Sequence, residues 1–278
     1  MYVEHLRIPI GSGALHAERV GRGGHPIVLL HGFGTCAFLW RRLSPALAET
    51  GYTAIAVDLL GHGESDRPSE ASFTLSAQAE YLARALAALR LPAVTLVGQD
   101  IGALVALLLA SSPRAKVDRV VMLSPPDPDD LPGTEVRSMQ RASARVALNA
   151  TTLFGAQPVL APLLRSGVTT AEGMTDLLVA RYLAPFVGTD GLSQLLQRAS
   201  AVELSDEGKG QLSRVACPIL LIEGDTAAPR PSLSWPAVLT AADVTVERIS
   251  GCGWLVPEDA AAALRDKLLA WFASQRTR

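Results

Sequence analysis

Cysteine is scarce in this chain of 278 residues, and an excess of charge of one sign is absent. The three cysteines, Cys36, Cys217 and Cys252, are odd in number and form no C-x-x-C pair, so they indicate neither a disulfide framework nor a zinc site. The 25 basic side chains nearly balance the 27 acidic ones, so the chain lacks the excess of positive charge that nucleic-acid binding usually needs. We therefore expect a reduced, cytoplasmic setting, no metal, and a small neutral molecule as partner.

The sequence also lacks a hydrophobic run long enough to cross a bilayer. Its longest apolar stretch, around Ile101 to Ala110, is too short for that purpose. The first ten residues alternate polar and apolar side chains and lack the basic and then apolar layout of a signal peptide. We therefore expect no membrane contact, which agrees with a cytoplasmic location.

Apolar residues are abundant, at 49% of the chain against 19% charged, and this predicts a compact, well-buried globule. Two alternating segments, Tyr2 to Ile10 and Ala14 to Val20, flank glycines and predict an antiparallel hairpin. Apolar runs typical of strands buried on both faces, such as Pro26 to Leu30 and Tyr52 to Val57, then alternate with helical segments. The alternation predicts an α/β fold with a mostly parallel central sheet flanked by helices.

The alternation of strands and helices stops in the middle of the chain, where only helical patterns follow one another. Such an insertion is typical of a lid over the carboxyl edge of a sheet, where α/β folds bind their ligands. We expect a core formed by residues 1–130 and 214–278, with a helical lid formed by residues 131–213.

The most informative stretch is a tight turn, Gly98-Gln-Asp100-Ile-Gly102, between a predicted strand and a predicted helix. Small residues on each side of the apex are needed because the strand and the helix crowd a strained apical residue. The strain directs the apical side chain out into a pocket. Asp100 is therefore the candidate catalytic residue.

Three motifs together resemble the α/β-hydrolase superfamily. His31 to Gly34 is similar to its oxyanion loop, Asp58 to Ser65 to its D-x-x-G-x-G-x-S loop, and Gly98 to Gly102 to its nucleophile elbow. The resemblance covers nearly the whole chain and implies the α/β-hydrolase fold. With aspartate at the elbow, the chain is similar to epoxide hydrolases and haloalkane dehalogenases. In those enzymes a carboxylate attacks carbon, and a histidine then activates the water that hydrolyses the ester.

The same resemblance implies an oxyanion hole formed by the backbone N–H groups of Phe33 and Ile101. Candidate substrate-binding residues lie around it: His31, Gly32, Gln99, Tyr182 and Trp254. The indole ring of Trp254 would stack against a planar substrate. Tyr182 is the only tyrosine of the predicted lid, where epoxide hydrolases typically use a pair. The structural alternative for His31 is a hydrogen bond within its own loop, and for Gln99 and Trp254 it is packing.

The chain departs from the family pattern where the catalytic histidine is expected. The loop after the last predicted strand carries Trp254 at that position, and all five histidines lie in the first quarter of the chain. Ala227 stands at the usual acid position, which leaves Asp225 and Asp127 as candidate acids. An acid whose task is to orient a histidine has nothing to orient here. An ester formed on Asp100 would therefore lack a general base to activate water.

A carboxyl group in this setting is suited to other chemistry. Without an imidazolium beside it, Asp100 loses a charge partner and gains desolvation, and both changes favour its protonated form. We expect a cofactor-independent, non-hydrolytic enzyme of lyase, isomerase or cyclase type, in which Asp100 acts on a small apolar, polycyclic molecule. The alternatives are an epoxide hydrolase or dehalogenase with Asp100 as nucleophile, and a non-catalytic ligand-binding protein of the same fold. We expect a monomer or a homodimer.

Overall fold

The computed structural model describes residues 2–127, 136–137, 156–187, 190–226 and 234–275. Within these ranges the chain forms one eight-stranded sheet in the order β1-β2-β4-β3-β5-β6-β7-β8. The strands are β1 (Val3–Pro9), β2 (Ala14–Val20), β3 (Pro26–Leu30), β4 (Thr53–Val57), β5 (Val94–Gln99), β6 (Val117–Leu123), β7 (Ile219–Gly224) and β8 (Val244–Ile249). β1 and β2 form the predicted antiparallel hairpin at one edge, and β3 to β8 are parallel to one another.

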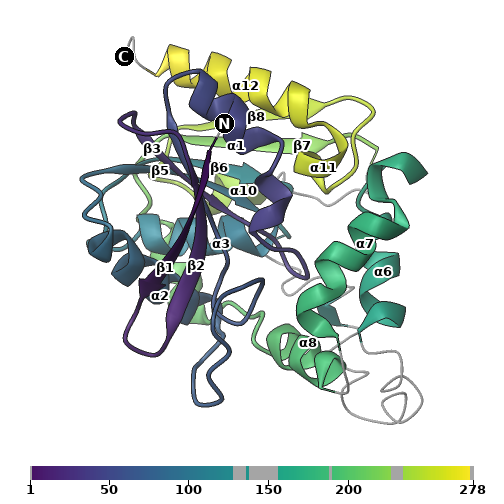
Figure 1. Cartoon of the computed structure of the whole chain (residues 1–278). Helices are drawn as coiled ribbons and strands as arrows, with labels where there is room; N and C mark the ends of the chain where they lie inside the picture. Colours follow the sequence, from purple (N-terminus) through teal and green to yellow (C-terminus); the bar gives the residue numbers. More distant parts are fainter. Residues whose placement is uncertain (1, 128–135, 138–155, 188–189, 227–233, 276–278) are drawn as a thin grey trace.

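Helices cover both faces of the sheet (Figure 1). α1 (Leu43–Glu49) and α12 (Ala261–Ser274) pack together on one face, and α2 (Leu75–Ala88) and α3 (Ile101–Ala110) pack together on the other. Three shorter helices lie in connections: η1 (Ala37–Trp40), α10 (Trp235–Val238) and α11 (Val256–Asp259). The predicted α/β architecture, a mostly parallel sheet between two helical layers, is confirmed.

The central strands are apolar along most of their length because helices cover both of their faces. Every residue of β4 and β5 is buried, and so are the first nine residues of α3. Burial of a single valine, leucine or isoleucine side chain contributes about 1.5–3 kcal/mol before the entropy cost of ordering the chain. This core fixes the carboxyl ends of β3 and β5, where the candidate site lies.

The regular elements in the described residues between β6 and β7 are all helices. They form α6 (Gln157–Arg165), η3 (Ala171–Met174), α7 (Asp176–Leu183), η4 (Ala184–Phe186), α8 (Gly191–Ser200) and α9 (Asp206–Leu212). Figure 1 shows α6, α7 and α8 together at one side of the sheet. The helical pattern of the predicted lid also covers residues 135–149, which lie outside the described residues apart from positions 136 and 137. We refer to the segment from α6 to α9 as the lid.

The lid contacts the core through a buried cation. Arg198 of α8 is only 3% exposed, its Nε donates to the carbonyl oxygen of Gly61 at 3.3 Å, and its guanidinium lies 4.3 Å from the ring centre of Phe73. Burial lowers the pKa of Arg198 to about 10.

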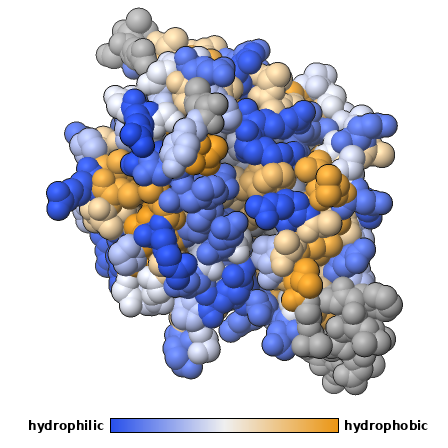
Figure 2. Space-filling view, in the orientation of Figure 1, coloured by the Kyte–Doolittle hydropathy of each residue, from blue (hydrophilic) through white to orange (hydrophobic). Residues whose placement is uncertain are grey.

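Figure 2 shows a mostly hydrophilic face in this view, with hydrophobic residues gathered in separate patches. Across the ranges given above, the helices are too short or too polar to cross a membrane.

Candidate functional site

The predicted elbow is present, and Asp100 is its apex. Asp100 has φ 54° and ψ −121°, a backbone conformation that residues other than glycine rarely adopt. The flanking glycines are required by close backbone contacts. A Cβ atom on Gly98 would lie 2.4 Å from the nitrogen of Ala103, and one on Gly102 would lie 2.5 Å from the carbonyl oxygen of Leu30. The strain at Asp100 is thus sustained by packing that excludes any larger neighbour.

The carboxyl group of Asp100 is almost enclosed, with the residue 7% exposed. The backbone N–H of Phe33 donates to its Oδ2 at 3.0 Å. This approach depends on Gly32, because a Cβ atom there would lie 2.8 Å from the Cβ of Asp100. Ile101 is the first residue of α3, so its N–H is one of the helix-end donors that have no acceptor within the helix. The loop after β3 and the start of α3 therefore converge on this one carboxyl group.

Trp254 lies in the loop after β8 and joins the elbow to the lid. Its carbonyl oxygen accepts a hydrogen bond from Nε2 of Gln99 at 2.9 Å, next to the apex. Its indole N–H donates to Oγ of Ser166 at 3.5 Å. A Cβ atom on Gly167 would lie 2.9 Å from the indole ring. Sequence reasoning missed Ser166 and Gly167, since nothing in a serine–glycine pair after a helix indicates the ring that packs on it.

His31 is fully buried, and both of its ring nitrogens contact backbone groups. Nε2 accepts from the N–H of Leu59 at 3.0 Å, which leaves Nδ1 to donate to the carbonyl oxygen of Gly32 at 2.8 Å. Burial lowers the pKa of His31, so the neutral ring that this arrangement needs is favoured. These two bonds hold the oxyanion loop in place and occupy the polar atoms that a substrate would otherwise contact.

The other four histidines also contact groups other than Asp100. His5 and His16 contact each other at 3.1 Å, and His16 also contacts Asp58 at 2.7 Å. His25 lies 3.0 Å from Oγ1 of Thr95, and His62 lies 3.3 Å from the carbonyl oxygen of Leu60. Burial lowers the pKa of His62 well below its usual range.

The two candidate acids lie in turns. Asp127 accepts hydrogen bonds from Oγ of Ser234 at 3.3 Å, between the segment after β6 and the start of α10. Asp225 accepts from the N–H of Gly251 at 2.7 Å, and bonds from Ser250 and from this N–H lower its pKa. Ala227 lies outside the described residues. Each carboxylate thus bridges two loops at the carboxyl edge of the sheet.

Tyr182 is buried on α7, and its hydroxyl donates to Oε1 of Glu258. Glu258 also forms a two-pronged ion pair with Arg41, at 2.5 Å and 2.8 Å. The structure therefore connects Tyr182 to a carboxylate of α11 and an arginine that follows η1. Sequence reasoning did not identify Arg41 or Glu258. The only signal was an acidic residue four positions after Trp254.

The cysteines are poor nucleophiles, because the thiolate is the reactive form. Burial raises the pKa of Cys36 to about 12, of Cys252 to about 12 and of Cys217 to about 11.

Comparisons with known proteins agree with this geometry. A family model described as the alpha/beta hydrolase fold matches residues 25–250. A haloalkane dehalogenase of Mycobacterium marinum is 40% identical over 100 residues, which are 36% of this chain and 34% of that protein. Epoxide hydrolase 3 of Siraitia grosvenorii is 41% identical over 106 residues, which are 37% of this chain and 33% of that protein. The chain thus matches about a third of the length of these curated relatives.

Among solved structures, Cfl2 of Burkholderia cenocepacia has a TM-score of 0.82 at 27% identity, covering 97% of this chain and 96% of its own. The haloalkane dehalogenase DbeA of Bradyrhizobium elkani has a TM-score of 0.82 at 21% identity, covering 99% of each chain, which shows a shared fold. The motifs, the sheet order and the family match lead to one conclusion: the chain belongs to the α/β-hydrolase superfamily.

Proposed function

We propose that this protein is a cofactor-independent enzyme in which Asp100 acts as an acid-base group on a small apolar substrate, without hydrolysis. The observation that carries the proposal is the position of the histidines. All five contact other groups, and Trp254 occupies the loop where the resemblance implies a histidine.

Trp254, at the position where the resemblance implies a histidine, bears on the second half of hydrolysis. If Asp100 attacked a carbon atom, it would form an ester and displace a halide or open an epoxide. Water must then attack that ester, and a positioned base usually accelerates such a step by about 10²–10⁴. Without that base the ester would accumulate, and the enzyme would stop after one turnover.

Proton transfer needs only the groups around Asp100. A substrate carbonyl oxygen at the N–H groups of Phe33 and Ile101 would take the place that Oδ2 of Asp100 occupies at Phe33. The carboxylate would remove a proton from the carbon next to that carbonyl, and the negative charge would develop on the oxygen. The same carboxyl group would then return the proton to another carbon of the substrate. This sequence is an isomerisation and consumes no water.

Burial suits Asp100 to this task. The residue is 7% exposed, and its Oδ2 accepts the N–H of Phe33, so the carboxyl group is held away from bulk water in a fixed orientation. A carboxyl group that exchanges a proton easily is more useful here than one that is fully ionised. Gln99, next to the apex, bonds to the carbonyl oxygen of Trp254. If the Trp254 ring turns to the substrate, it would favour planar or polycyclic molecules.

A hydrolase is the second candidate, and the relatives favour it, since they include proteins named haloalkane dehalogenase and epoxide hydrolase. The bond from Phe33 to Oδ2 also orients the carboxylate as a nucleophile would need.

The two candidates can be separated with chosen probes. For proton transfer, 2-tetralone and 5-androstene-3,17-dione are incubated with the protein in D₂O, and NMR follows deuterium uptake next to the carbonyl. For hydrolysis, styrene oxide and 1-bromobutane are incubated with the protein, and diol, alcohol and covalent adducts are measured by chromatography and intact-mass spectrometry. Asp100→Asn is the test variant. Asp266→Asn, an exposed position on α12, is the matched control.

We expect proton exchange above the buffer rate in the wild type and in Asp266→Asn, and a loss of about 100-fold or more in Asp100→Asn. Repeated turnover of either hydrolysis probe would contradict the proposal and favour the second candidate. Unaltered recovery of every probe, with tight binding of a ketone, would instead identify a ligand-binding protein.

A further inference from the structure

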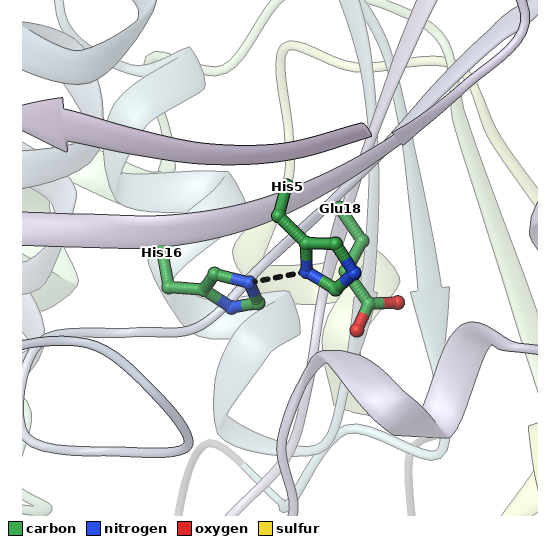
Figure 3. Close-up of side chains that lie close together, drawn as sticks. All are labelled: His5, His16 and Glu18. Atoms are coloured by element: carbon green, nitrogen blue, oxygen red, sulfur yellow. Dashed lines mark hydrogen bonds between the residues drawn. The ribbon is translucent and has the colours of Figure 1, made fainter. Parts of the chain in front are cut away.

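Three side chains on the edge hairpin point toward one another: His5 of β1, and His16 and Glu18 of β2 (Figure 3). His5 is directly opposite Glu18 in the antiparallel register. His16 lies two residues before Glu18, so it shares the same face of β2. One potential ligand atom from each residue lies within 4.8 Å of the other two. The hairpin backbone, rather than a flexible loop, therefore brings these groups together.

The ring of His16 is fixed by a buried carboxylate. Its Nδ1 lies 2.7 Å from Oδ2 of Asp58, a residue that is 2% exposed. Asp58 is held in turn by the N–H groups of Ala37, at 2.6 Å, and Glu64, at 2.9 Å. An imidazole that donates one N–H to a carboxylate presents its other nitrogen as a lone pair, and this is how metal-binding histidines are usually oriented. Nε2 of His16 is that second nitrogen, and it faces His5.

The spacing of the two rings fits a tetrahedral metal ion. Nδ1 of His5 and Nε2 of His16 are 3.1 Å apart. Two nitrogens at the usual zinc distance from one tetrahedral ion lie about 3.3 Å apart, which is close to this spacing. The His5 ring is exposed, so it can turn toward an ion. Glu18 supplies an oxygen, which completes a set of two imidazoles and one carboxylate. Imidazole ligands suit zinc, copper, nickel and iron better than magnesium or calcium.

The site borders a cavity of about 400 Å³ that His16 and Glu18 help to line. Glu64 also lines it, and its Oε2 lies 3.8 Å from Nε2 of His16, within reach of a fourth coordination position. The nearest cation on β1, Arg7, pairs with Asp66 at 2.5 Å. Two more cations line the cavity: Arg67 donates to the carbonyl oxygens of Gly63 and Ser65, and Arg181 lies 3.7 Å from Oε1 of Glu64. The carboxylates of Glu18 and Asp58 beside the two imidazoles are what favours a divalent cation here.

We propose that His5, His16 and Glu18 bind a divalent first-row transition metal ion, of which zinc is the best fit, at the β1–β2 edge of the sheet. The ion would bind Nδ1 of His5 in the tautomer that carries its proton on Nε2, in place of the N–H that His5 now directs at His16, and would connect β1 to β2. The site is separate from the elbow, so it does not depend on the function proposed for Asp100. Cysteine spacing gives no sign of it, because its ligands are two histidines and a glutamate.

The test uses the full-length chain without a histidine tag. Protein stripped with a chelator is titrated with Co²⁺, whose visible absorption reports tetrahedral coordination, and Zn²⁺ binding is measured by calorimetry. The test variants are His5→Gln and Glu18→Gln, neither of which removes a core side chain. His25→Gln is the matched control, since it removes a histidine from another part of the chain.

We expect one equivalent of metal in the wild type and in His25→Gln, with a tetrahedral Co²⁺ spectrum that Zn²⁺ abolishes. His5→Gln and Glu18→Gln should each weaken binding by at least about tenfold, the loss that follows even when only an orienting partner is removed. Zinc should also raise the melting temperature of the wild type and not that of His5→Gln. The proposal is wrong if the wild type binds no stoichiometric metal, or if either test variant binds as the wild type does.

Discussion

Replacement of Tyr182 by phenylalanine tests how the lid is held to the core. The Tyr182 hydroxyl donates to the Glu258 carboxylate, whose side chain is only 1% exposed. A hydrogen bond to a charged group contributes about 1.5–3 kcal/mol. Because Arg41 continues to pair with Glu258 in the variant, no buried charge is left alone. We therefore expect Tyr182→Phe to lower the free energy of unfolding by about 2 kcal/mol, measured by urea denaturation.

Two comparisons make this prediction specific. Tyr81→Phe on α2 is the matched control, since its ring packs 6.0 Å from the guanidinium of Arg84 and phenylalanine keeps that ring. We expect a much smaller loss there. In a double-mutant cycle, Tyr182→Phe should cost far less once Glu258→Gln has removed the charged acceptor. If Tyr182→Phe unfolds within about 0.5 kcal/mol of the wild type, the bond from the lid to Glu258 does not stabilise the protein.

The same pair predicts a dependence on alkaline pH. Burial, followed by the charge of Glu258, raises the pKa of Tyr182 well above its usual value. The native protein therefore keeps this proton at pH values where the unfolded chain, with a pKa of about 10, has lost it. The stabilisation is complete below about pH 10 and is lost as the pH rises, by up to about 1.4 kcal/mol per pH unit. Tyr182→Phe should lack this part of the slope, and equal slopes in the two proteins would refute the reasoning.

Two further predictions concern the elbow and the thiols. Gly102→Ala should destabilise the protein by about 3 kcal/mol in urea denaturation, because the new Cβ would lie 2.5 Å from the backbone oxygens of Leu30 and His31. Gly210→Ala, in α9 with open space around it, should instead stabilise by about 0.5–1 kcal/mol, and a similar loss in both variants would contradict the packing explanation. Cys36, with its thiol pKa raised to about 12, should react with iodoacetamide at pH 8 only after denaturation, and rapid labelling of the native protein would show that the thiol is accessible.

The sheet and the elbow could be predicted from the sequence because local pattern determines them. Strands buried on both faces leave uninterrupted apolar runs, and β3, β4 and β5 lie where those runs are. The turn at Asp100 needs a small residue on each side, so its glycines mark it. Both features depend on residues that are close together in the sequence, so the sequence pattern reveals them.

The contacts around the lid could not be predicted, because they join residues far apart in the sequence. Arg41 and Glu258 are separated by 217 positions, and Tyr182 and Glu258 by 76. Tyr182 was expected to contact substrate because tyrosines do so in related lids, yet its hydroxyl is bonded to Glu258. The pairing of His16 with Asp58, over 42 positions, has the same origin. The packing of the folded chain decides which two side chains meet in such a pair. The residue types alone do not reveal that packing.

The packing of Trp254 against the lid constrains how this sequence can change. A histidine at position 254 would supply the base that hydrolysis needs, but it would also remove the ring that packs against Gly167 and bonds to Ser166. The space left by the smaller ring lies where a Cβ on residue 167 would point, so a larger residue there could fill it. Positions 254 and 167 should therefore change together. Among similar sequences, glycine at 167 should accompany tryptophan at 254, and larger residues at 167 should accompany histidine.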